Sequence, residues 1–137
     1  KALRLTMAKE INPFLMFPCG AEAAMNFYLS LFPGARIESL AHYGAEGPGV
    51  AGSVKQATLL LLGRRFEFFD SPVQHAFTFT PAISFAVACD DVEEINRLFA
   101  KLSDGGQVLM ALDAYPFAKR FGWLNDKFGV SWQLRLT

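Results

Sequence analysis

The chain has 137 residues with equal numbers of acidic and basic side chains, so its formal net charge is zero. This balance gives no attraction to nucleic acid or to an anionic membrane surface, and we expect neither as a partner. The length fits one domain over residues 1–137 with its own core. Fourteen Phe residues and a hydrophobic fraction of 52% exceed the needs of an average soluble domain, which predicts an apolar cavity or a subunit interface.

No segment approaches the roughly 20 consecutive apolar residues that a helix needs to cross a bilayer. The first ten residues lack the apolar core of a secretory signal. We therefore expect a cytoplasmic protein, with Met7 as an alternative natural start. Cys19 and Cys89 are too few for a disulfide framework and form no CxxC motif, so we expect two free thiols.

The first half of the chain predicts the element order β-α-β-β-β. Residues 11–17 form a short apolar run that contains Pro13, as is typical of an edge strand. A helix follows, because apolar residues recur at helical spacing until Pro33-Gly34 ends the pattern. We expect three further strands over residues 36–43, 55–62 and 65–70, with a Gly-rich loop over 44–53 and a turn at Gly63-Arg64.

The second half repeats this order. Residues 82–88 alternate between large and small side chains, which predicts a strand with its large side chains against a helix. Asp90 or Asp91 is expected to cap that helix, with Glu93 or Glu94 placed as in a capping box. We expect the helix to bury Val92, Ile95, Leu98, Phe99 and Leu102, and to be followed by a strand over 108–112, a loop over 113–119 and a hairpin over 120–136 that turns at 126–129.

The two halves can be overlaid in sequence. A shift of 66 residues places Phe66 on Trp132 and Glu67 on Gln133, and a shift of 70 residues matches the two predicted helices. Internal repetition of this kind indicates two copies of one structural unit. We therefore divide the chain into a first βαβββ module over residues 9–70, a connector over 71–81 and a second βαβββ module over 82–137.

Four stretches of the sequence together resemble a known family: INPFLMF, AEAAMNFYLSLFPGARIESL, DSPVQHAFTFTPAISF and KRFGWLNDKFGVSWQL. They are similar to the vicinal oxygen chelate superfamily, which has the fold of glyoxalases and bleomycin-resistance proteins. Within it, they resemble the PhnB-like branch named after a 3-demethylubiquinone-9 3-methyltransferase domain. The resemblance implies an α+β fold in which two βαβββ repeats with two main helices form a curled eight-stranded mixed-sheet cup. It also implies a small-molecule cavity and a homodimer.

The resemblance also locates the metal ligands used by other members of the superfamily, on the first and fourth strands of each module. The first-strand positions correspond to Pro13 and Ala82, which carry no ligand atom, and the fourth-strand positions to Glu67 and Gln133. Two side chains hold a divalent ion weakly, because catalytic sites of this kind usually have three protein ligands. We therefore expect no metal and no other cofactor, with a weakly bound divalent ion as the alternative.

The family's methyltransferase name implies a methyl donor of nucleotide type. Proteins usually hold such a donor at a Gly-rich turn between a parallel strand and a helix. No such motif occurs in this sequence. The name therefore does not establish an enzymatic activity for this chain.

Three functions remain open from the sequence. The protein binds or processes a small molecule without a metal, or it is a metal-dependent glyoxalase-like lyase or dioxygenase, or it is a non-enzymatic dimeric scaffold with a vestigial cavity. Under the first function, the candidate ligand-binding residues are the polar and aromatic side chains expected at the cavity: Gln133, Ser84, Trp123, Tyr43, Tyr115, Phe121 and Arg120.

Glu67 is the candidate general acid or base. The repeat and the family resemblance both place it on the cavity face of a central strand, between two Phe residues. A carboxyl group there can exchange a proton with a bound ligand. The alternative is a structural role, in which Gln133, Arg65 or Arg120 forms a hydrogen bond with it.

Overall fold

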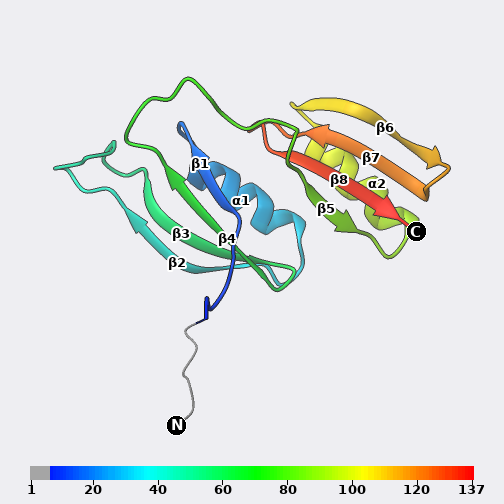
Figure 1. Cartoon of the computed structure of the whole chain (residues 1–137), viewed down its shortest axis with the longest axis horizontal. Coiled ribbons are helices and arrows are strands. Elements are labelled where there is room, and N and C mark those ends of the chain that lie inside the picture. Colours follow the sequence, from blue (N-terminus) through cyan, green and yellow to red (C-terminus); the bar gives the residue numbers. More distant parts are fainter. Residues whose placement is uncertain (1–6) are drawn as a thin grey trace, which may run out of the picture. The chain divides into compact units, whose positions relative to one another are not determined.

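The computed structural model describes residues 7–137, which divide into one unit ending at His75 and another starting at Ala76. Each unit contains a four-stranded sheet and one helix (Figure 1). The predicted α+β class with two βαβββ repeats is therefore confirmed. The first module comprises β1 Phe14–Phe17, α1 Ala21–Leu31, β2 Arg36–His42, β3 Val54–Leu61 and β4 Arg64–Asp70; the second comprises β5 Phe85–Ala88, α2 Val92–Ser103, β6 Gln107–Tyr115, β7 Ala118–Asn125 and β8 Ser131–Leu136.

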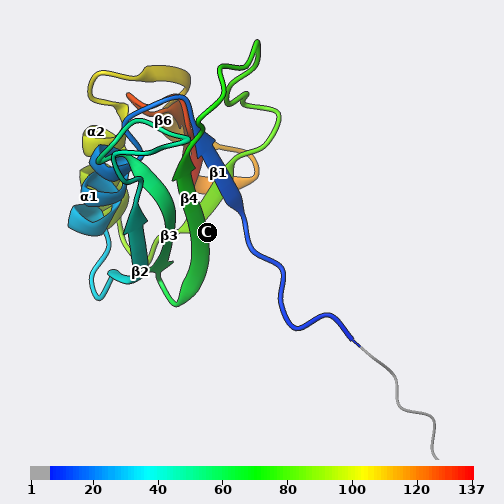
Figure 2. The ribbon, with the colours of Figure 1, turned by 90° about the vertical axis from the view of Figure 1, so that its left-hand side faces the viewer.

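The strands of the first module are ordered β1-β4-β3-β2, with β1 parallel to β4 and the other pairs antiparallel. The helix α1 covers one face of this sheet (Figure 2). Side chains alternate along β4, so Phe66 and Phe68 are buried toward α1 while Glu67 and Phe69 point to the opposite side. We call the side of each sheet that faces away from its own helix the open face.

A buried aspartate links the helix of the first module to its sheet. The Asp70 carboxylate accepts hydrogen bonds from the backbone N–H of Ala21, at the start of α1, and of Val54, at the start of β3, both at 2.9 Å. The N-cap residue of α1 is Gly20, which has φ of 80° and no side chain that can cap the helix. Asp70 therefore caps α1 from the end of β4.

The second module has the same arrangement, ordered β5-β8-β7-β6 with β5 parallel to β8. Its helix carries its own cap, because Asp91 accepts from the Glu94 N–H at 2.8 Å and the Glu94 carboxylate accepts from the Asp90 N–H at 2.9 Å. The predicted cap is therefore confirmed at Asp91, and Glu94 returns to the N–H of the residue before the cap rather than to that of the cap itself. Trp132 and Leu134 are buried, as the alternation in the last strand indicated.

Two predicted connections are wrong. Leu62 and Gly63 form the turn between β3 and β4, both at positive φ, and Arg64 already belongs to β4. The loop expected over residues 113–119 is largely strand, because β6 continues to Tyr115 and β7 begins at Ala118. Irregular pairing between β6 and β7 accommodates the extra length, and it blurs the two-residue alternation by which a strand is recognised.

The elements around α2 also differ from the prediction. The strand β5 begins at Phe85 rather than at residue 82, and Ile83, expected to pack against a helix, is 73% exposed before it. Val92 is 50% exposed at the first position of α2, ahead of the buried stripe formed by Ile95, Leu98 and Leu102. No helix within residues 7–137 is long and apolar enough to cross a membrane.

Candidate functional site

The centre of the first module's open face is a row of cross-strand neighbours. Ser39 on β2 lies opposite Thr58 on β3, which lies opposite Glu67 on β4, which in turn lies opposite Phe14 on β1. Neighbours of this kind are close enough for their side chains to touch. Phe69, two residues after Glu67, contacts Phe14 with ring centroids 5.2 Å apart. The row therefore places one carboxyl group beside two aromatic rings.

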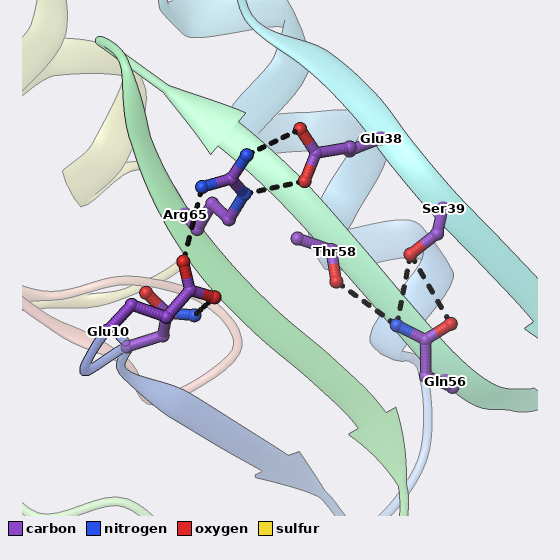
Figure 3. A network of polar contacts seen from close by, with 7 residues as sticks. Glu10, Glu38, Ser39, Gln56, Thr58 and Arg65 are labelled. Atoms are coloured by element: carbon purple, nitrogen blue, oxygen red, sulfur yellow. Dashed lines mark hydrogen bonds and ion pairs between the residues drawn. The ribbon is translucent and has the colours of Figure 1, made fainter. Parts of the chain in front are cut away.

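The charged groups beside this row are paired with one another (Figure 3). Arg65 donates to both carboxylate oxygens of Glu38, from Nε at 2.6 Å and from Nη2 at 3.2 Å, and from Nη1 to Glu10 at 3.3 Å. The hydrogen bond from Arg65 lowers the pKa of the Glu38 carboxyl group, and the bond to Glu38 raises the pKa of the guanidinium. Both groups are therefore ionised, and Arg65 is bound by two acids.

The neutral polar groups of β2 and β3 are paired as well. The amide Nε2 of Gln56 donates to the hydroxyl oxygens of Ser39 and Thr58, each at 3.1 Å (Figure 3). This arrangement fixes the orientation of the Gln56 side chain between the two strands. Most polar side chains around the centre of the open face thus have partners within the module.

Glu67 differs from these neighbours. It is half-buried, and among the described residues its carboxylate forms no hydrogen bond or ion pair. Arg65 is held by the two acids named above, and Arg120 donates instead to Asn96 on α2 at 2.9 Å. The two arginines considered as structural partners of Glu67 are therefore engaged elsewhere, and its carboxylate is accessible to a ligand on the open face.

The matching row of the second module carries no charge. Ala86, Gln133, Trp123 and Met110 lie opposite one another on β5, β8, β7 and β6. Trp123 is half-buried and donates from Nε1 to the Ser131 hydroxyl at 2.9 Å. The side-chain amide of Gln133 has no hydrogen-bond partner within residues 7–137, so it can offer donors and an acceptor to a ligand.

Asn125 is a polar residue near this row that we did not predict. It pairs with Ser131 across β7 and β8, and its Oδ1 atom is buried without a hydrogen-bond partner in the described part of the chain. A buried acceptor of this kind is costly unless water or a ligand donates to it. An Asn at the end of a strand is common before a turn, so the sequence carries no signal that singles it out.

Two of the predicted aromatic residues lie together on the β6–β7 hairpin. Tyr115 and Phe121 both contact Phe117, with ring centroids 5.5 Å and 5.0 Å away. Phe121 is buried on the open face, two residues before Trp123, whereas Phe117 is 62% exposed at the hairpin tip. The cluster therefore extends the apolar surface next to Trp123.

Three other predicted ligand-binding residues lie outside both rows. Tyr43 is buried, with its hydroxyl donating to the Asp70 carbonyl at 3.1 Å, and belongs to the core of the first module. Arg120 points to the α2 side of its sheet, where it binds Asn96. Ser84 precedes β5 and is half-buried. Each module therefore has its own candidate surface, with Glu67 on the open face of the first and Gln133, Trp123 and Phe121 on the open face of the second.

The donor set does not fit the metal site that the superfamily resemblance implies. Within residues 7–137, no three His, Cys, Asp or Glu side chains lie close enough together to hold a metal ion. The residue opposite Gln133 is Ala86, whereas Ala82, expected in that role, precedes the strand. Phe14 lies opposite Glu67 on β1. Neither first strand supplies a ligand atom at these positions.

The fold and these residues can be compared with known proteins. A family model described as 3-demethylubiquinone-9 3-methyltransferase matches residues 9–135. The chain belongs to this family. The PhnB protein from Bacillus cereus, which carries the same methyltransferase name provisionally, is 53% identical to this member, with a TM-score of 0.92 over 94% of this chain and 100% of that one. The resemblance to the PhnB-like branch is therefore confirmed.

More distant structures share the fold of this family member. A protein from Pseudomonas aeruginosa is 26% identical, with a TM-score of 0.81 over 94% of this chain and 98% of that one. A variant of the fosfomycin-resistance protein FosX from Listeria monocytogenes, complexed with Mn(II) and 1S,2S-dihydroxypropylphosphonic acid, is 12% identical, with a TM-score of 0.65 over 95% and 93% of the two chains. This likeness shows a shared fold alone. A search among curated protein sequences found no match.

Proposed function

We propose that this PhnB-like protein binds a small organic molecule on the open faces of its sheets, and processes or sequesters it without a metal ion. The observation that carries the proposal is the Glu67 carboxylate, half-buried and without a partner among the described residues. Burying part of a carboxylate costs free energy unless a donor or a cation reaches it. Since the nearby Arg65 is bound by Glu38 and Glu10, a ligand is the partner that this arrangement favours.

The second module also has side chains suited to an organic ligand, but they are an indole ring and an amide rather than a carboxylate. Trp123 presents a half-buried indole ring on the open face, and directly opposite it lies the Gln133 amide, which has no hydrogen-bond partner among the described residues. Ligand sites typically combine aromatic surface with a few polar groups that fix orientation. Trp123 supplies the aromatic surface of such a site, and Gln133 supplies a polar group.

Glu67 is our candidate general acid or base for a ligand bound on the first module. Its row neighbours Ser39, Thr58 and Phe14 carry hydroxyl or aromatic groups, so Glu67 is the member of the row with a carboxyl group. Proton transfer requires a titratable group within hydrogen-bond reach of the ligand. Under this proposal, Glu67→Gln retains the fold and loses turnover or affinity.

Under this proposal, neither the stability of the folded protein nor its affinity for the ligand depends on a metal ion. An ion bound only by the folded state would stabilise it by mass action, and its removal would lower the melting temperature. We expect the melting temperature to be unchanged after dialysis against EDTA. A drop of several degrees, restored by one divalent ion, would favour the metal-dependent lyase or dioxygenase instead.

We also propose that the protein is a homodimer. Several large apolar side chains are exposed, and apolar surface of this kind often marks an interface. A monomer mass by light scattering at micromolar concentration would contradict the proposal. The side chains concerned include Ile37, Leu62, Ile83 and Phe117, exposed by 38%, 60%, 73% and 62%.

The experiment that tests the ligand-binding proposal is a thermal-shift screen with a metabolite panel. Each compound that raises the melting temperature is then titrated into the parent, Glu67→Gln and Glu46→Gln, the last being a control at an exposed loop position of the same module. We expect at least one compound whose affinity falls in Glu67→Gln and not in Glu46→Gln. If every compound binds all three proteins equally, the ligand does not use Glu67 and the proposal fails.

A further inference from the structure

The charges around Glu67 specify the kind of ligand that its row can bind. The carboxylates of Glu10, Glu38 and Glu67 lie on the row or in the network beside it, together with the guanidinium of Arg65. Arg36, opposite Leu60 at the edge strand, adds a second positive charge and also lowers the pKa of the Glu38 carboxyl group. One negative charge therefore remains in excess among these groups, and Glu67 is the carboxylate that has no partner in the described part of the chain.

Arg65 lies two residues before Glu67 on the same face but is already bound to Glu38 and Glu10, and uncharged groups occupy the other positions around Glu67. Phe14 lies opposite it on β1, Phe69 follows two residues later on the same face, and Thr58 lies opposite it on β3. The Thr58 hydroxyl accepts from the Gln56 amide at 3.1 Å. The Phe14 and Phe69 rings lie 5.2 Å apart at their centroids and are tilted by 59°, so their faces and edges are presented at an angle rather than stacked flat.

From this arrangement we infer that the open face of the first module binds an organic cation, an ammonium or amidinium group carried on an apolar or aromatic body. The inference rests on the proposed function, because it names the class of ligand for the site already described. The charged head forms an ion pair with Glu67, and the body packs against Phe14 and Phe69. An aromatic ring attracts a cation placed over its face, which adds to the ion pair.

The same surface suits other ligand classes less well. An anion would meet the excess negative charge, and the guanidinium beside Glu67, that of Arg65, is already bound to Glu38 and Glu10. A neutral polar molecule would leave the Glu67 carboxylate without a counter-charge. A metal ion would need about three protein ligands, which the row does not supply. A single carboxylate with aromatic neighbours is, in contrast, sufficient for an organic ammonium ion.

The test compares three probes of matched shape: benzylamine, benzyl alcohol and benzoate. Each is titrated into ¹⁵N-labelled protein, and amide shifts are followed at Phe14, Thr58 and Glu67. We expect benzylamine to bind about tenfold more tightly than either other probe, as an additional ion pair with a ring contact implies. Glu67→Gln should abolish this preference, and the control Glu46→Gln should retain it.

A second variant distinguishes the contribution of the Glu67 charge to binding from that of the aromatic rings. Phe14→Ala should weaken benzylamine binding by about threefold while the preference over benzyl alcohol persists, because the carboxylate remains. The inference is overturned if benzylamine shows no preference, if Glu67→Gln keeps the preference, or if no probe shifts these amides at millimolar concentration. If benzyl alcohol or benzoate binds as tightly as benzylamine on the same residues, the cation class fails while the proposed ligand-binding function stands.

Discussion

The two modules repeat one scaffold and use acidic side chains differently. In the first, Asp70 at the end of β4 caps α1 from a distance, and Glu67 has no partner on the open face among residues 7–137. In the second, α2 is capped by its own Asp91, and Gln133 takes the place of Glu67. The repeat therefore preserves strand order and register, while the unpaired charge belongs to only one of the two rows. The two modules thus share a fold without sharing the charged side chain on the open face.

The largest expected effect tests the distant cap. Asp70→Ala leaves the N–H groups of Ala21 and Val54 without an acceptor inside the protein, and each buried, unpaired donor costs about 1–3 kcal/mol. We expect the free energy of unfolding to fall by about 3 kcal/mol, measured by urea denaturation. Asp91→Ala, the matched change at the local cap of α2, should cost about 1 kcal/mol. Equal losses in the two variants would remove the contrast between the modules.

The second largest expected loss of stability concerns the residue just before the second strand of each module. The first module has Ala35 there, which carries a Cβ, whereas the second module has Gly106, which does not. A Cβ at Gly106 would overlap the Asn125 carbonyl oxygen and lie 2.9 Å from the Asp126 carbonyl carbon. We expect Gly106→Ala to lower the free energy of unfolding by about 2 kcal/mol, because backbone atoms cannot move aside as a side chain can.

The control for that change is Gly34→Ala in the first module. Gly34 has φ of 75°, and no atom lies within 4 Å of the position that a Cβ would occupy, so the backbone conformation is what resists the substitution. Its expected cost is about 1 kcal/mol. If Gly106→Ala is tolerated better than Gly34→Ala, the close approach at Gly106 is not a constraint of the second module.

The smallest effect distinguishes the two thiols. Burial raises the pKa of Cys89 to about 11, with the carboxylates of Glu94 and Asp90 contributing, whereas Cys19 is exposed. The folded state therefore holds the Cys89 proton over a wider pH range than an ordinary thiol does, and the reactive thiolate appears only as the pH approaches that value. At about pH 8, a disulfide reagent should modify Cys19 quickly and Cys89 only on unfolding. Rapid modification of folded Cys19→Ser would contradict this.

The features that sequence reasoning predicted depend on local patterns. The element order followed from hydrophobic periodicity, the Asp91 cap from a motif of four residues, and the burial of Trp132 from alternation along one strand. Each of these can be read from residues that are neighbours in the chain. The placement of Glu67 on one face of a central strand came instead from the internal repeat and the family resemblance.

The features that it missed depend on contacts between distant segments. Asp70 and Ala21 are 49 residues apart, and no local motif marks an aspartate as the cap of a remote helix. The turn at Leu62 and Gly63 escaped prediction because leucine rarely adopts positive φ. The partner of Arg65 is Glu38, on another strand, so the availability of Glu67 became evident only once the side chains were placed.

The most direct test of the account is a crystal structure with the tightest compound from the metabolite screen. We expect ligand density on the open face of the first module, with a donor or cationic atom of the ligand within hydrogen-bond distance of the Glu67 carboxylate. Arg65 should remain bound to Glu38 in that structure. A ligand held elsewhere, with the Glu67 carboxylate paired to a protein side chain, would contradict the account.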